Sequence, residues 1–125
     1  MEHSSVSVGW SKKISDESPE IVKVIEKVDT LLGKEELIGH PLSILKLIES
    51  MPGDGKIEDR ISMLELLPPS LKRAFYTPER RRASVSFRVR DLGIATYDPV
   101  FKRIEKGIEE IQIQHPEFQL SLIHI

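Results

Sequence analysis

A strand-then-helix pattern occurs twice in this chain, about 80 residues apart, and this repeat constrains the fold more than any other feature. In the first unit, the residues from Ser4 to Trp10 alternate between apolar and small polar side chains, which predicts a strand with one buried face. Ser18 and Pro19 then form a helix start signal, and apolar residues recur at helical spacing up to Gly33. The first unit is therefore predicted to be a strand followed by an amphipathic helix.

The second unit begins with the alternating segment Ala83–Val89, whose apolar side chains fall on one face. Asp98 is the expected N-cap of the next helix, and Pro99 is expected at its first turn. The pair His115-Pro116 predicts the end of that helix, because the residue before a proline disfavours helical geometry. A final strand is expected from Phe118 onward, so the second unit is a complete β-α-β segment.

Two β-α-β units in series predict an α+β fold of the ferredoxin-like, split β-α-β type, with a four-stranded antiparallel sheet and two helices on one face. The short segment Glu35–His40 takes the place of the second strand in the first unit. We expect one domain over residues 1–125, with residues 4–40 as its first half and 80–125 as its second. Residues 41–79 are predicted to be a helical insertion, because they carry too little apolar surface for a core of their own.

Three short elements are expected inside the insertion, separated by turn signals. Leu42, Leu45 and Ile48 predict one short helix, and the stretch MPGDG at residues 51–55 predicts a turn. A second helix is predicted from Ile57 to Leu67, ending at Pro68-Pro69, and the stretch SLKRAFY predicts a last helical turn.

The composition excludes several classes of protein. Hydrophobic residues make up 39% and charged residues 30% of the chain, which is typical of a globular domain. The sequence contains no cysteine, so disulfide frameworks, thiolate catalysis and cysteine-ligated zinc are ruled out. A net charge of −2 lacks the basic excess of most nucleic-acid-binding proteins. No apolar run approaches the roughly 18 residues of a membrane span, and the first residues lack the features of a signal peptide.

The sequence shows no arrangement of residues that favours catalysis, a metal or a cofactor. No nucleotide-binding, nucleophile-elbow or calcium-binding motif is present. Adjacent carboxylates on a helix point about 100° apart and do not converge on one substrate atom; the pairs are Glu35-Glu36, Glu58-Asp59 and Glu109-Glu110. The histidines lack metal-ligand spacing and are read as turn or surface residues; they are His3, His40, His115 and His124. We therefore predict a protein that is not an enzyme.

The most conspicuous charge pattern is ERRRASVSFRVRD, residues 79–91. Phosphorylation of Ser84 is disfavoured because a kinase cannot seat a residue held inside a strand. RNA binding is disfavoured because Phe87 shares the apolar face and leaves no exposed aromatic platform. Arg88 and Arg90 are instead predicted to lie on the polar face of the strand, where they pair with carboxylates or contact a neighbouring domain.

In order along nearly the whole chain, five segments resemble the first periplasmic domain of a resistance-nodulation-division (RND) exporter. They are SVSVGW, SPEIVKVIEKVDTLL, ELIGHPLSILKLIESMPG, LLPPSLKRAFYTPERRRASVSFRVRD and YDPVFKRIEKGIEEIQIQHPEFQLSL. The nearest branch is the one related to mycobacterial-membrane-protein-large and hopanoid-type transporters. Porter subdomains of this superfamily are built from β-α-β repeats, in agreement with the fold predicted from the residues.

The resemblance implies part of a proton-driven efflux transporter of lipidic or hydrophobic substrates, on the periplasmic side of the bacterial inner membrane. The chain would be the loop between the first two membrane spans, with Met1 an added start. Its partners would be the sister periplasmic domain, the transmembrane helices of the same protein and the substrate, and no nucleic acid; whether the full-length protein is a homo-oligomer stays open. The proton-coupling residues would lie outside this chain.

Two groups of residues follow from this hypothesis. Arg88 and Arg90 are candidates for contacts between domains. Apolar side chains of the insertion are candidates for the substrate path, with packing in the core as the competing role; they are Leu67, Leu71, Phe75 and Tyr76. The alternative to a transporter domain is a free-standing ferredoxin-like ligand-binding or sensing module that dimerises through its sheet.

Overall fold

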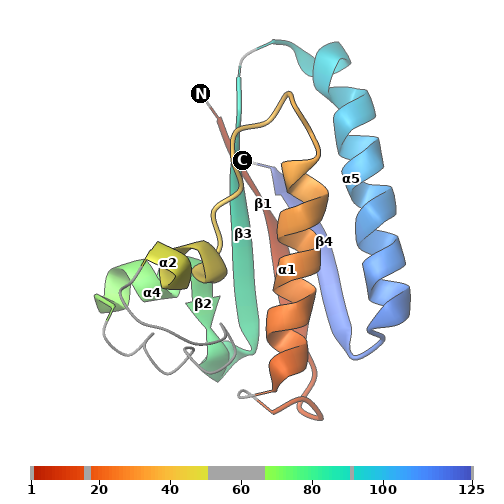
Figure 1. Ribbon diagram of the computed structural model, residues 1–125. Coiled ribbons are helices and arrows are strands. Elements are labelled where there is room, and N and C mark those ends of the chain that lie inside the picture. Colours follow the sequence, from red (N-terminus) through yellow and green to blue (C-terminus); the bar gives the residue numbers. More distant parts are fainter. Residues whose placement is uncertain (1, 16–17, 51–66, 91, 125) are drawn as a thin grey trace.

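The computed structural model describes residues 2–15, 18–50, 67–90 and 92–124 (Figure 1). In chain order the elements are β1 (Glu2–Trp10), α1 (Pro19–Gly33), α2 (Ile44–Ser50), α4 (Pro69–Phe75), β2 (Tyr76–Thr77), the 3-10 turn η2 (Pro78–Arg80), β3 (Arg82–Val89), α5 (Ile94–Gln114) and β4 (Phe118–His124). The strands form one antiparallel sheet in the order β2-β3-β1-β4. Helices α1 and α5 lie side by side over one face, and α2 and α4 lie near β2 (Figure 1). The predicted ferredoxin-like α+β fold with a helical insertion is confirmed.

The core lies between the sheet and the two long helices. Alternation in the strands directs every second side chain inward, so Val6, Val8 and Trp10 of β1 are buried, as predicted. The inward residues of β3 and the apolar stripes of the helices complete it; among them are Ala83, Val85, Phe87, Val89, Ile21, Val24, Ile25, Val28, Val100, Ile104 and Ile108. The opposite face of the sheet carries small polar side chains and arginine, also as the alternation predicts.

Helix α1 begins and ends where its sequence signals predict. Pro19 is its first residue, and the Ser18 hydroxyl accepts a hydrogen bond from the Glu20 backbone N–H at 3.2 Å. This bond satisfies one of the N–H groups that a helix start leaves without a partner. The helix extends to Gly33.

Helix α5 does not begin at the predicted Asp98-Pro99 pair. It starts at Ile94, and Pro99 lies inside it. Asp98 therefore does not cap the helix; its carboxylate pairs with Lys102 one turn further on, at 3.0 Å. The extra turn carries Tyr97 into the core, where its side chain is only 4% exposed. The predicted end at His115 is correct.

The predicted strand Glu35–His40 does not form. Only two isolated bridges connect this part of the chain to β3, from Ile38 to Val89 and from Leu42 to Ser86. Ile38 and Leu42 are four positions apart in the chain, whereas their partners Val89 and Ser86 are three apart. The register therefore slips by one residue between the two bridges, which interrupts the pairing. The fourth strand of the sheet is instead β2, which pairs with the opposite end of β3.

The insertion contains the first and last of its predicted helices. Leu45 and Ile48 are buried in α2, whereas Leu42 precedes the helix and bridges to β3. The stretch SLKRAFY falls in α4 and β2. The predicted turn at residues 51–55 and most of the helix predicted from Ile57 to Leu67 lie outside the described residues.

Candidate functional site

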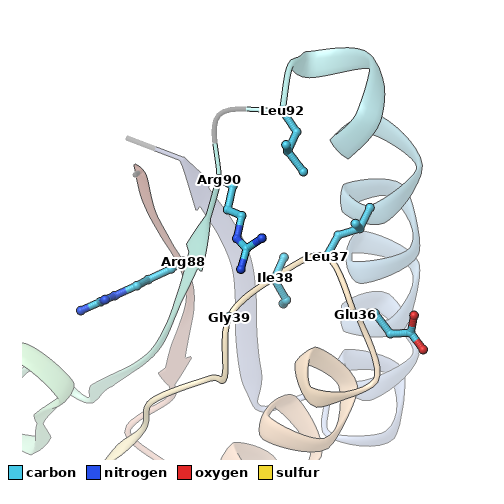
Figure 2. Close-up of a pocket in the computed structure, with 7 residues that line it drawn as sticks. All are labelled: Glu36, Leu37, Ile38, Gly39, Arg88, Arg90 and Leu92. Carbon is cyan, nitrogen blue, oxygen red and sulfur yellow. The ribbon is translucent and has the colours of Figure 1, made fainter.

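A small cavity lies where the end of β3 faces the loop after α1, and we call it the Arg90 pocket (Figure 2). Its volume is about 250 Å³. It is lined by Glu36, Leu37, Ile38, Gly39, Arg88, Arg90 and Leu92. The pocket thus brings together two elements. One is Arg88 and Arg90, which were candidates for contacts between domains, and the other is a loop that the sequence predicted to be a strand.

Backbone pairing holds one wall of the Arg90 pocket against the other. The Gly39 N–H donates to the Arg88 carbonyl oxygen at 2.9 Å, and Ile38 bridges to Val89. The bond from Gly39 and the bridge at Ile38 place the loop beside the last residues of β3, so that Arg90 and Leu92 lie opposite Leu37 and Ile38.

The Tyr97 hydroxyl joins the same two walls. It accepts a hydrogen bond from the Arg90 backbone N–H at 2.8 Å and donates one to the Leu37 carbonyl oxygen at 3.2 Å. The ring stacks on Phe101, with the two centroids 5.7 Å apart. Tyr97 is therefore the positioning residue of the pocket. The sequence does not single it out, because Tyr97 directly precedes the predicted N-cap, Asp98, and so falls outside the predicted helix.

The chemistry of the pocket is one guanidinium beside apolar side chains. Arg90 extends toward Ile38, and Leu92 points into the same gap, whereas Arg88 and Glu36 point outward (Figure 2). Large apolar side chains are exposed around it: Leu37 is 42%, Leu92 49% and Ile94 88% exposed. A volume of about 250 Å³ is below the range of most small-molecule sites. The arrangement suits an anionic group with an apolar neighbour, such as a lipid headgroup or an acidic side chain.

The predicted substrate-path residues do not gather at this pocket. They lie in and beside α4, near β2. Tyr76 is buried, and its ring stacks on Trp10 with centroids 6.2 Å apart. Leu67 and Phe75 are half-buried and pack against the core, and Leu71 is exposed. Tyr76 is thus a core residue, and only Leu71 has the exposure that a substrate surface requires.

A second candidate site is the carboxylate of Asp29, which lies between α1 and α2. The Ser43 hydroxyl donates to its Oδ2 at 2.7 Å, and its Oδ1 is buried without a partner in the described part of the chain. Burial raises the pKa of Asp29 above its usual range, while the Ser43 hydrogen bond and the charge of Lys46 act in the opposite direction. Asp29 also lines a cavity of about 500 Å³ with His40 and Lys46.

His115 lies at the end of α5, directly before a turn, as predicted, but its side chain is buried and not at the surface. Its Nδ1 lies 2.8 Å from Glu20 Oε2, and its Nε2 lies 2.8 Å from Lys27 Nζ. Because the Lys27 ammonium can only donate, Nε2 accepts and the ring proton is assigned to Nδ1. Lys27 also donates to the Gln114 side chain at 2.8 Å. The network connects α1 to the end of α5.

Metal-ligand clusters and membrane-spanning helices are both absent from the described part of the chain. Within residues 2–15, 18–50, 67–90 and 92–124, no three side chains of His, Asp or Glu converge as a metal site would require. Across the same ranges, no helix combines the length and the apolar character needed to traverse a bilayer.

Comparison of the chain with protein-family models, with curated proteins and with solved structures found no match. The resemblance to RND exporters therefore rests on the sequence segments and the predicted repeat alone.

Proposed function

We propose that the chain is a periplasmic porter-type domain of an RND-type, proton-driven exporter of lipidic or hydrophobic molecules. The domain forms part of the substrate path and relays conformational change to its neighbours. It contributes no catalytic residue.

One observation carries the proposal: the first and last described residues, Glu2 and His124, lie at the same end of the sheet as three exposed apolar side chains. These side chains are Leu37, Leu92 and Ile94. The pairing of Ser4 with His124 puts the start of β1 beside the end of β4, and Glu2 pairs with Val89 at the end of β3 (Figure 1). A domain inserted between two membrane spans needs adjacent ends. Many domains have adjacent ends, so this feature alone does not distinguish a membrane-attached domain. The exposed apolar side chains around the Arg90 pocket are the feature that favours a position next to a membrane.

The physical role of this end follows from its side chains. Leu92 and Ile94 present apolar surface, and Arg90 presents a cation that attracts anionic headgroups or acidic side chains of the transmembrane part. The sheet behind them is a rigid element, because its strands are paired along their length. A displacement of the attached membrane helices would therefore move the domain as a body.

The edges of the sheet count against the alternative, a module that dimerises through its sheet. The outer N–H of Leu120 on edge strand β4 donates to the Gln112 side chain at 2.8 Å, and the N–H of Phe118 donates to the His115 carbonyl at 2.9 Å. These bonds occupy donors that a second copy would need for edge pairing. The outer side of β3 is occupied by β2, Gly39 and Leu42.

A labelling experiment in the intact parent protein tests the proposed orientation. This domain has no cysteine, so Leu92→Cys adds one attachment point for a fluorophore in a parent protein from which cysteines outside the domain have been removed. We expect a lipid-borne quencher to reach this label. Lys13→Cys, at the other end of β1, is the matched control, since about eight residues of strand separate the two ends by roughly 27 Å.

Two results would overturn the proposal. One is a parent reading frame without membrane-spanning segments on both sides of this stretch. The other is equal quenching at both labels. Arg90→Glu adds a functional test: the isolated domain should stay folded while the exporter loses transport, and Lys106→Glu on the exposed side of α5 should leave transport unchanged.

A further inference from the structure

The end of the sheet opposite the Arg90 pocket carries a second charged feature, the consecutive residues Arg80, Arg81 and Arg82. They border a hollow of about 540 Å³ on the open face of the sheet, which we call the triple-arginine hollow. Its floor includes Ser7, Gly9 and Ser121. A volume of this size lies within the range of small-molecule sites.

Within the described part of the chain, the charges of the three arginines have no ion-pair partner. Glu117 also lines the hollow, but its Oε2 accepts a hydrogen bond from the Ser11 hydroxyl at 2.6 Å. Among the described residues that line the hollow, three cations lie beside one carboxylate, so this lining is positive on a chain whose net charge is −2.

The backbone at Arg81 is the second independent observation. Its φ of 53° and ψ of 51° lie in the left-handed region, and it is the one non-glycine residue with positive φ in the described part of the chain. Glycine or asparagine adopts this conformation at lower cost. An arginine held there points to a use for its side chain beyond the turn itself.

The floor of the hollow is open because a glycine, Gly9, lies in it. Register places Gly9 between Arg82 of β3 and Gln119 of β4, and Ser7 between Ser84 and Ser121. A Cβ at Gly9 would make only ordinary contacts, with the carbonyl oxygens of Gln119 at 3.7 Å and Arg81 at 3.8 Å. Packing therefore does not require glycine at position 9. Because Gly9 has no side chain, there is room directly below the arginines.

We propose that the triple-arginine hollow binds a phosphate-bearing ligand. The planar guanidinium groups match phosphate oxygens in pairs, and the serine hydroxyls of the floor supply further donors. The ligand is either a soluble phosphate ester or a phosphorylated lipid. The inference stands independently of the proposed transport function, since it rests on residues at the other end of the sheet.

The test is a titration of the chain with inorganic pyrophosphate at constant ionic strength, followed by the amide shifts of Gly9, Arg81 and Ser121. We expect saturable shifts in the wild type. Arg81→Asn should weaken binding about tenfold or more, because it removes charge-assisted hydrogen bonds. Its melting temperature should be unchanged or higher, since asparagine tolerates the left-handed region.

Two further variants separate a site from general electrostatics. Gly9→Ala should weaken binding through the obstructed floor while the chain stays folded. Lys106→Gln removes the same charge on α5 and should leave binding unchanged. Absence of saturable shifts, equal loss in Lys106→Gln, or full binding by folded Arg81→Asn would each overturn the proposal.

A parallel titration with short-chain phosphatidic acid, below its micelle concentration, distinguishes the two sources of phosphate. Tighter binding of the lipid than of pyrophosphate identifies a phosphorylated lipid. Equal or weaker binding identifies a soluble phosphate ester.

Discussion

The two strand-then-helix units carry nearly the same start signal, yet their helices begin differently. In the first, Ser18 caps α1 and Pro19 is its first residue. In the second, α5 begins at Ile94 with Gly93 as its N-cap residue, no side chain caps it, and Pro99 lies within the helix. A capping residue followed by proline therefore marks the start of the helix in one unit and lies inside the helix in the other.

Tyr97 explains the difference. Burying a large apolar side chain contributes about 1.5–3 kcal/mol, and each hydrogen bond of the hydroxyl contributes about 1 kcal/mol. Together these contribute about 3.5–5 kcal/mol, which more than offsets the roughly 3 kcal/mol that a proline costs inside a helix. Local start signals thus hold only where no long-range contact of similar size competes with them.

The largest expected effect in this comparison comes from Tyr97. Tyr97→Ala should lower the free energy of unfolding by about 3–5 kcal/mol, because it removes the packed ring and both hydrogen bonds. Tyr97→Phe should cost about 2 kcal/mol, since the Arg90 N–H and the Leu37 carbonyl lose their partner. Urea denaturation measures both, and faster amide exchange at Arg90 should accompany them. A neutral Tyr97→Phe would show that the hydroxyl does not offset the cost of Pro99 within α5.

The two prolines should respond with opposite signs. Pro99→Ala restores a backbone N–H inside α5 and should stabilise the protein by about 2 kcal/mol. Pro19→Ala at the first position of α1 should destabilise it by about 0.5 kcal/mol, because proline there is preorganised and loses no bond. Thermal and urea unfolding of the matched pair measures the contrast. Equal signs would show that the two positions are equivalent after all.

The two cap residues should differ in a smaller way. Ser18→Ala should cost about 1 kcal/mol through loss of the bond to the Glu20 N–H. Asp98→Ala should cost at most about 0.5 kcal/mol, because it removes only an exposed pair with Lys102. Urea titration measures the free energy of unfolding of both variants. A loss for Asp98→Ala as large as that for Ser18→Ala would indicate that Asp98 caps a helix, which the structure does not show.

The smallest expected effect is a change in the pH dependence of stability at Asp29. It is small because the Ser43 hydrogen bond and the charge of Lys46 oppose the effect of burial on the pKa of this carboxyl group. A raised pKa in the folded state means that this group favours folding most below its unfolded pKa. That contribution is lost as the pH rises through the folded pKa. The stability of Asp29→Asn relative to wild type should therefore increase from pH 3 to pH 7. Exposed Asp98→Asn is the control, and a pH-independent difference at Asp29 would refute the assignment.

Much of the fold could be predicted from short stretches of sequence. Alternation over Ser4–Trp10 and Ala83–Val89 predicted two strands and their buried faces, and the Ser18-Pro19 pair predicted the start of α1. A signal for the true start of α5 was also present: the apolar spacing of Phe101, Ile104 and Ile108 extends back to Tyr97, past Pro99. The Asp98-Pro99 pair is the stronger local signal, so the sequence alone predicts the later start.

The candidate site was predicted only in part. Arg88 and Arg90 were singled out, but as neighbours on one polar face, whereas their side chains diverge (Figure 2). The loop opposite them was predicted to be a strand, and nothing local indicated the slip in register between Ile38 and Leu42. The transport assignment and the single-domain division stay predictions.

The sequence by itself determined which residues alternate, which helix is capped and which side chains are apolar, because these signals act over a few neighbouring residues. Tertiary structure decided where α5 begins, how the outer side of β3 is paired, and which side chains meet at the Arg90 pocket. The Tyr97 hydroxyl bonds the carbonyl of Leu37, which is 60 positions away in the chain. A contact of that separation exists only once the sheet and helices have assembled, and its energy is large enough to override a local signal.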